Sequence, residues 1–182
     1  KDYEIDSRNH PQRVLQRGLI TLRHLKVLGA IAIAVQLFAS LALDHGFGAI
    51  TRRWLVVFIY SALMAKEFFI GTWLSRHLVL YAISHMLVLP MAVLWLAQIG
   101  VGQGPLPASA YLLALVSLFS GFAFEIGRKT RAPEDERPTV DSYSKVMGLH
   151  GAVYTLIALS LLLGAVLVVL VLHLSSSKVP FV

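Results

Sequence analysis

Two aspartates near the start of the chain, Asp2 and Asp6, lie four residues apart in the stretch KDYEID. If this stretch is helical, that spacing places both carboxylates on one face of the helix. Mg²⁺ is usually bound by one or two carboxylates together with the oxygens of a phosphate. The D-x-x-x-D spacing alone is a weak signal, because it also arises by chance on exposed helices.

A second group of candidate residues lies in FEIGRKTRAPEDERP, residues 124–138. Glu125 is at the end of an apolar segment, where a carboxylate is expected to face a partner or a polar cavity, because burying a charge in the membrane costs roughly 2.5–3.5 kcal/mol. Arg128, Lys129 and Arg131 follow it, and Arg is well suited to bidentate contact with phosphate. These bases could bind a departing diphosphate. The alternative is a basic stop signal at the end of a membrane span.

Lys66 and Glu67 are adjacent within the apolar stretch FIYSALMAKEFFIG. Neighbouring residues point in different directions on a helix, so each is expected to find a different partner inside the protein. The alternative for Lys66 is an ammonium group that snorkels to the membrane interface. His85 is a further polar group at membrane depth, and a hydrogen bond to a neighbouring helix is the simpler interpretation of it.

The composition places these groups in a membrane protein. Of the 182 residues, 57% are hydrophobic and 14% are charged, and the mean hydropathy is +0.71, whereas about 25% of residues in soluble domains are charged. The chain has no cysteine, which excludes disulfides, thiol nucleophiles and Cys metal sites. A net charge of +6 would suggest nucleic acid in a soluble protein. In a membrane protein it reflects basic cytoplasmic loops, so no nucleic-acid partner is expected.

Five apolar segments are long enough for a transmembrane helix, which needs about 20 residues. We therefore expect an all-α, polytopic transmembrane helical bundle that forms a single domain over residues 1–182. Pro90 predicts a kink in the third span, and the linker GVGQGPLPAS at 100–109 predicts a tight, uncharged turn. The predicted spans are Val27–Leu43, Trp54–Leu74, Leu78–Ile99, Ala108–Phe124 and Leu149–Leu174.

If the chain crosses the membrane five times, most of its charged residues lie on one side. The segments on that side are residues 1–26, 71–77 and 128–145. Of the 16 Lys and Arg residues, only Arg52, Arg53 and Lys178 fall on the other side, so the first side is predicted to be cytoplasmic. Of the 10 Asp and Glu residues, only Asp44 falls on the opposite, non-cytoplasmic side. The positive-inside rule does not explain this uneven distribution of acids. Acids clustered with bases indicate a metal ion with a polyanion, and salt-bridged loops are the alternative.

The opening of the chain resembles the first aspartate motif of the UbiA superfamily of intramembrane prenyltransferases. That motif reads N-D-x-x-D-x-x-x-D and is followed by a stretch like P-x-R-P-L-P-S-G, and here DYEID precedes HPQRVLQRG. Asp2 and Asp6 match the last two aspartates. The positions that match the following stretch are Pro11, Arg13, Leu15 and Gly18, and those that depart from it are Val14, Gln16 and Arg17.

The second motif of the superfamily is less faithfully matched. Glu125 stands in the place of its first aspartate, Arg128 and Ala132 replace the next two, and DSYSKVMG at 141–148 resembles the closing segment. This departure is typical of a divergent branch. Carboxylates at shifted positions are Glu134, Asp135 and Glu136, and the residues that resemble the family's Tyr and Lys of the fourth helix, at a different spacing, are Tyr60 and Lys66.

The resemblance implies a fold of nine transmembrane helices, in which the five predicted spans correspond to about helices three to seven. The chain would then be a fragment that lacks two helices at each end. The resemblance also implies an integral membrane protein of the cell inner (plasma) membrane, with its motif loops in the cytoplasm.

The implied activity is Mg²⁺-dependent transfer of a prenyl group from a polyprenyl diphosphate to a lipophilic or aromatic acceptor. The competing interpretation, which the altered second motif favours, is a non-catalytic membrane subunit with a structural or assembly role and a membrane-complex partner. A CDP-alcohol phosphotransferase is disfavoured, because its D-x-x-D-G-x-x-A-R signature is absent. The implied residues are Asp2, Asp6, Lys66 and Glu125 for catalysis, Arg13, Arg128, Lys129, Arg131 and Lys145 for the diphosphate, and Asp2, Asp6, Glu125 and Asp135 for Mg²⁺.

Overall fold

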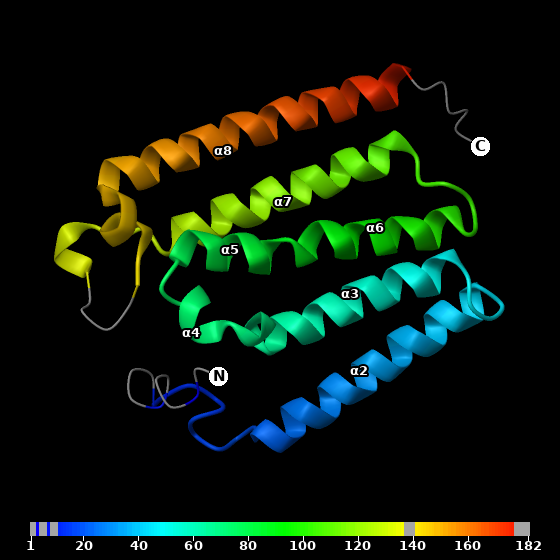
Figure 1. The fold of residues 1–182 in the computed structure, drawn as a ribbon, viewed down its shortest axis with the longest axis horizontal. Coiled ribbons are helices and arrows are strands. Elements are labelled where there is room, and N and C mark those ends of the chain that lie inside the picture. The colour runs from blue at the N-terminus through cyan, green and yellow to red at the C-terminus, as the bar shows by residue number, and fades with distance from the viewer. Residues whose placement is uncertain (1–2, 4–6, 8–10, 137–140, 177–182) are drawn as a thin grey trace.

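The computed structural model describes residues 3, 7, 11–136 and 141–176. Within this part of the chain every regular element is a helix, so the predicted all-α fold is confirmed (Figure 1). The elements are α2 (Leu22–Leu43), α3 (Ala49–Ala65), the short 3₁₀ turn η1 (Glu67–Phe69), α4 (Gly71–Leu74), α5 (Leu78–Met86), α6 (Val88–Val101), α7 (Ala108–Arg128), the 3₁₀ turn η2 (Pro133–Asp135) and α8 (Tyr143–Ser176).

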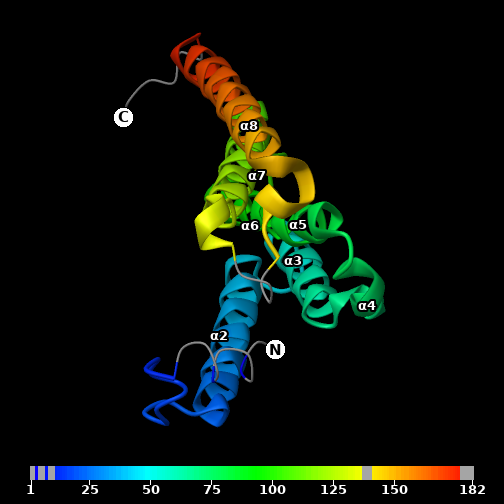
Figure 2. The ribbon, with the colours of Figure 1, turned by 90° about the vertical axis from the view of Figure 1, so that its left-hand side faces the viewer.

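The long helices form a row in chain order, and each packs on the one before and the one after it. The row begins with α2 and ends with α8 (Figures 1 and 2). One end of the row, here called the motif end, holds residues 11–21, 66–77 and 129–136. The opposite end holds the turns at 44–48 and 102–107. The described turns therefore alternate between the two ends as the sequence predicts.

Four helical segments are long and apolar enough to cross a membrane, namely α2, the consecutive pair α5 and α6, α7 and α8. With 17 residues, α3 is at the lower limit of about 17–25 residues for a spanning helix, and it packs between α2 and α6. Large apolar side chains are exposed along the row, including Phe38 at 69% and Leu161 at 70%. Exposed apolar surface on this scale marks contact with the membrane, and the protein is an integral membrane protein.

The predicted bounds of the second span, Trp54–Leu74, are wrong. Because α3 begins at Ala49 and ends at Ala65, Lys66 and Glu67 lie in the turn that follows the helix and not inside it. The backbone of residues 67–69 is left-handed, with φ of 51°, 53° and 61°, which ends the helix. Gly71 makes room for this turn, since a Cβ there would collide with the carboxylate of Glu67.

Two further interruptions agree with the sequence. The break between α5 and α6 precedes Pro90, which has no N–H to donate to the carbonyl four residues earlier, so the predicted kink is confirmed. Gly148 has φ 74° and ψ 160° inside α8. It separates a short first segment, residues 143–147, from the long apolar segment that starts at Leu149, where the fifth span is predicted to begin.

A small core lies at the motif end, where α5, α7 and α8 meet. Its fully buried members are Ala82, Ile126, Tyr143 and Ala152. The two alanines let the helices approach closely, as small residues do between membrane helices. This core fixes the end of α7 and the start of α8 against each other, and those are the segments that carry the second predicted motif.

Candidate functional site

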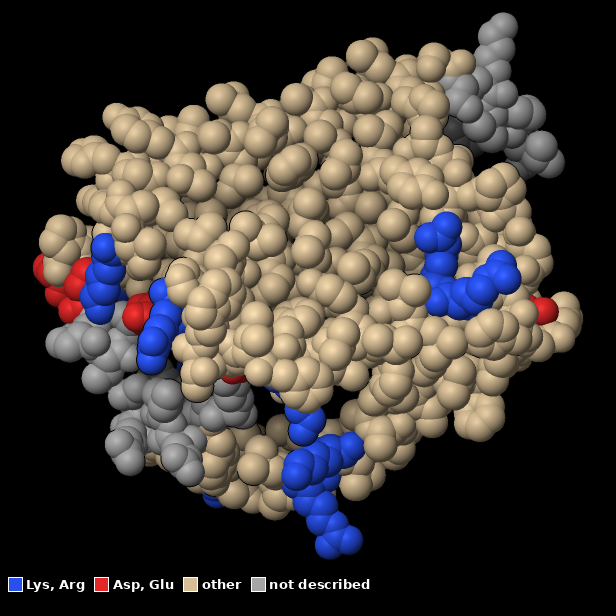
Figure 3. Space-filling view, viewed as in Figure 1, with Lys and Arg blue, Asp and Glu red and all other residues tan. Residues whose placement is uncertain are grey.

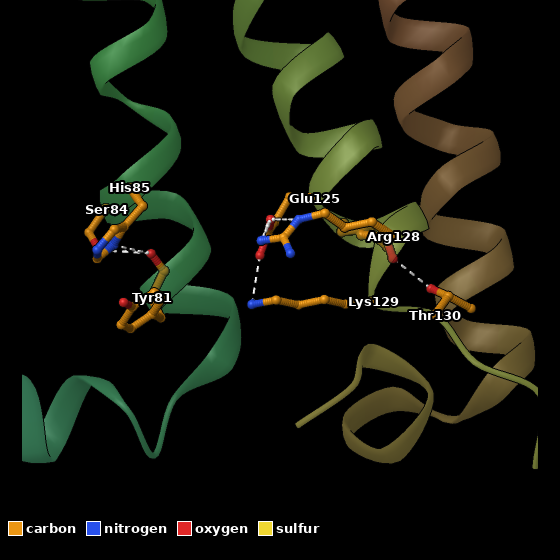
Figure 4. A network of polar contacts seen from close by, with 8 residues as sticks. Tyr81, Ser84, His85, Glu125, Arg128, Lys129 and Thr130 are labelled. Carbon is orange, nitrogen blue, oxygen red and sulfur yellow. Dashed lines mark hydrogen bonds and ion pairs between the residues drawn. The ribbon is translucent and has the colours of Figure 1, made fainter. Parts of the chain in front are cut away.

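The last turn of α7 carries a buried carboxylate between two cations (Figure 4). Glu125 is only 5% exposed. The Arg128 guanidinium donates to its Oε2, with Nε at 2.6 Å, and the Lys129 ammonium lies 2.8 Å from its Oε1. The spacings of three and four residues place all three side chains on one face of the helix. The structure therefore joins three predicted site residues, and each oxygen of Glu125 contacts one base.

A second carboxylate fastens the following loop to the start of α8. The Oε1 of Glu136 accepts hydrogen bonds from the hydroxyls of Ser142, at 2.6 Å, and Ser144, at 2.7 Å. The ammonium group of Lys145 lies 3.7 Å from its Oε2. The Ser142 hydrogen bond, followed by that of Ser144, holds the pKa of Glu136 below its usual range. The charged side chain of Glu136 thus holds the end of the loop 129–136 against the start of α8.

A polar hollow of about 460 Å³ lies beside Glu136 and Arg128. Arg131 lines it and is tied to α8 by a hydrogen bond from its backbone N–H to the Ser144 hydroxyl, at 2.8 Å. Its side-chain Nε is buried and has no partner among the described residues. A buried, cationic donor without an acceptor is costly unless a ligand completes it. The hollow is lined by Arg128, Thr130, Arg131, Ala132, Glu134, Asp135 and Glu136.

The sequence marked Ser142 as a match to the closing segment of the second motif, but it did not predict the contacts of Ser142, Tyr143 and Ser144 at this end of the molecule. The Ser142 hydroxyl accepts from the backbone N–H of Lys145 at 3.2 Å, as a helix N-cap does, and a serine just before a helical segment is the available signal. The phenol of Tyr143 is 1% exposed, and its hydroxyl has no partner among the described residues. Nothing in the sequence pattern marks that burial.

A cluster of four ring side chains from α3, η1 and α5 lies beside this site, namely Tyr60, Phe68, Tyr81 and His85. The ring of His85 stacks on Tyr81 with centroids 4.0 Å apart, and its Nδ1 lies 2.9 Å from the Tyr81 carbonyl (Figure 4). His85 thus has a partner on its own helix, where the sequence predicted a neighbouring one. The hydroxyl of Tyr60 donates to the Ser84 carbonyl at 2.7 Å and joins α3 to α5. Phe68 contacts both Tyr60 and His85 edge-on.

Three other described site residues, Lys66, Asp135 and Arg13, lie at the motif end without joining the Glu125 group. Lys66 is exposed where α3 ends, and Asp135 is exposed on the wall of the hollow. Arg13 is exposed in the turn before α2, at the far edge of the row from α8 (Figure 2). Asp2 and Asp6 lie outside the described residues.

The described residues do not by themselves fit Mg²⁺. Among them, no three His, Asp or Glu side chains lie close enough together to hold a metal ion. Both oxygens of Glu125 are already in contact with bases. Among the residues that line the hollow, two are arginines and three are acids, so the two guanidinium groups are the part of its lining that suits an anion.

The comparisons with known proteins agree with this picture at the level of the family. The model of the UbiA prenyltransferase family matches residues 1–182. Comparison with the curated proteins and with the solved structures finds no match. An all-α integral membrane fold is expected of that family. The chain belongs to the UbiA prenyltransferase family.

Proposed function

We propose that the protein transfers a prenyl group from a polyprenyl diphosphate to a lipophilic or aromatic acceptor, and that the hollow beside α7 receives the diphosphate. The observation that carries this proposal is the buried Nε of Arg131, which lacks a partner among the described residues and belongs to a side chain that lines the hollow. An Arg guanidinium binds phosphate oxygens bidentately. The apolar surface of the row suits the prenyl tail.

The bases of the site have distinct roles in this proposal. Arg131 binds the diphosphate in the ground state. Arg128 and Lys129 lie in contact with Glu125 and stabilise the charge that builds on the diphosphate as it leaves. The allylic C–O bond breaks with its electron pair passing to the diphosphate oxygen. A nucleophilic atom of the acceptor then forms the new bond to the prenyl carbon and loses a proton.

Lys66, Arg13 and Lys145 complete the proposed set of bases at the motif end. Mg²⁺ would supply further charge neutralisation for the departing diphosphate. Asp2 and Asp6 are proposed to hold it, together with Asp135 and with Glu125 once a base moves from its carboxylate to the diphosphate. The motif end is proposed to face the cytoplasm across the inner (plasma) membrane, because most Lys and Arg residues fall on that side.

The second candidate function is a non-catalytic membrane subunit that keeps the family fold. It is favoured by the pairing of Glu125 with two bases, and no group of three His, Asp or Glu side chains among the described residues could hold a metal ion. Such a subunit would use the same contacts as structural salt bridges. It would not need to bind a prenyl diphosphate.

The test is a comparison of Arg131→Gln, Arg131→Lys and a control, Arg76→Gln, which removes an exposed base at the same end but outside the hollow. Binding of an unreactive prenyl thiolodiphosphate is measured by titration of the protein in detergent. A hydrogen bond to a charged group is worth about 1.5–3 kcal/mol, so Arg131→Gln should weaken binding by roughly tenfold or more. Arg131→Lys should recover part of the affinity, and the control should bind like the wild type.

Unchanged affinity in Arg131→Gln would refute the assignment of the hollow. Release of diphosphate in the presence of aromatic and lipophilic acceptors then separates the two functions. Arg131-dependent binding together with turnover supports the transferase. Binding without turnover for any acceptor class supports the non-catalytic subunit.

A further inference from the structure

A second polar hollow lies at the opposite end of the molecule, far from the predicted motifs. It has a volume of about 320 Å³, at the lower end of the range of about 300–1,000 Å³ for ligand pockets. Its walls come from the first turn of α3, the end of α6 and the turn that follows α6. Its polar lining consists mainly of Arg52, Arg53, Gln98 and Gln103, with Gly104 and Pro105 beside them.

A buried glutamine builds this hollow. Gln98 is only 1% exposed, and its amide nitrogen donates to the carbonyls of Gly102, at 2.6 Å, and Gly104, at 2.9 Å. Its amide oxygen accepts from the Nε of Arg53 at 2.6 Å. Gln98 therefore holds both the turn and the guanidinium in place. This contact uses one of the five donors of Arg53, and among the described residues the other four have no hydrogen bond that would keep them from a ligand.

The charge of the two arginines is not balanced at this end of the described structure. Asp44 is the acid present there, and its carboxylate accepts from the backbone N–H groups of Ile50, at 3.2 Å, and Thr51, at 2.7 Å, and from the Gln103 amide. It caps α3 and makes no ion pair with Arg52 or Arg53 among the described contacts. Basic side chains are visible at this end, where α3 begins, in Figure 3.

We propose that this hollow is a binding site for a phosphate group, carried by a lipid headgroup or by a soluble phosphate ester. Two adjacent guanidinium groups, one of them anchored by a buried amide, match the bidentate geometry that phosphate oxygens require. The hollow lies where the apolar parts of α3 and α6 end, which is the depth of lipid headgroups.

The experiment uses the purified protein in a neutral detergent and follows its thermal unfolding midpoint as ligand is added. The probes are short-chain phosphatidylglycerol, short-chain phosphatidylcholine and glycerol phosphate. The double variant Arg52→Gln/Arg53→Gln is compared with Arg23→Gln/Arg76→Gln, which removes the same charge from exposed positions at the motif end. The site variant should bind each probe to which the wild type responds roughly tenfold more weakly or worse, whereas the control variant should match the wild type.

The probes identify the source of the phosphate. A response to phosphatidylglycerol alone assigns a lipid headgroup, and an equal response to glycerol phosphate assigns a soluble ester. Equal weakening in both double variants would mean that only net charge matters and would overturn the proposal, as would wild-type binding by the site variant. Arg53→Gln removes the donor to the buried amide oxygen of Gln98, so Arg52→Gln alone is the second variant. It should weaken binding without lowering the unfolding midpoint of the unliganded protein.

Discussion

Replacement of Gly148 by alanine tests how the start of α8 is held against α7. Gly148 has φ 74° and ψ 160°, a conformation that is essentially restricted to glycine. No atom lies within 4 Å of the position of an added Cβ, so the penalty comes from the backbone and not from a clash. A residue held in such a conformation costs on the order of 1–3 kcal/mol, and Gly148→Ala should destabilise the fold by that amount.

The matched control is Gly164→Ala in the long segment of the same helix. Gly164 is helical, and an added Cβ there also meets no atom within 4 Å. Alanine is favoured over glycine by about 0.8–1.0 kcal/mol inside a helix, so this change should be neutral or stabilising. The two variants add the same methyl group to one helix. Relative to the wild type, the free energy of unfolding should fall in Gly148→Ala and should stay the same or rise in Gly164→Ala.

The assay is reversible unfolding of the purified protein in mixed micelles, combined with titration of prenyl thiolodiphosphate. Gly148→Ala should also weaken diphosphate binding, because the kink places Ser142 and Ser144 on Glu136 at the edge of the hollow. If Gly148→Ala were as stable as Gly164→Ala, the kink would not be a feature of the folded protein. The burial of Tyr143 against α7 would then also be wrong.

Two further changes follow from the same contacts. Tyr143→Phe should be neutral or stabilise the protein by about 1 kcal/mol in the same unfolding assay, because it removes a buried hydroxyl that has no partner among the described residues. A clear loss of stability would mean that the hydroxyl makes a hydrogen bond in the folded protein. Partial burial raises the pKa of Asp44, but hydrogen bonds from Thr51, Ile50 and Gln103 outweigh it and hold the pKa at about 2 instead of 3.8. The stability that this depressed pKa contributes is fully present above pH 3.8 and is lost as the pH falls toward 2. Over that pH range the unfolding midpoint should therefore fall more steeply in the wild type than in Asp44→Asn. Parallel plots of midpoint against pH for the two proteins would contradict the role of Asp44 as a cap.

The fold was predictable where hydropathy and chain-breaking residues decide the structure. Apolar length predicted the helices, and Pro90 predicted the break between α5 and α6, because a proline lacks the donor that a helix needs. The end of α3 was not predictable in this way. Phe68, Phe69 and Ile70 are as apolar as a membrane span, so hydropathy extends the helix through them. The turn instead depends on a left-handed backbone and on the space beside Gly71, which only the three-dimensional structure reveals.

In the candidate site, too, the contacts set by local helical spacing were predictable, and those set by the non-local path of the chain were not. The contacts of Glu125 with Arg128 and Lys129 follow from helical spacing and were accessible from the sequence. The hydrogen bond between Ser142 and Glu136 depends on how the loop closes, and no periodicity of the sequence predicts it.

The bases of the site differ in the contacts they already make. Arg128 and Lys129 share a buried carboxylate, whereas the Nε of Arg131 has no such partner among the described residues. A diphosphate that enters the hollow can bind the Nε of Arg131 without displacing another hydrogen-bond acceptor from it, but it competes with Glu136 for the charge of that guanidinium. It must also compete with Glu125 for the other two bases. Arg131 should therefore determine affinity, and the Glu125 group should determine how strongly charge on the departing diphosphate is stabilised.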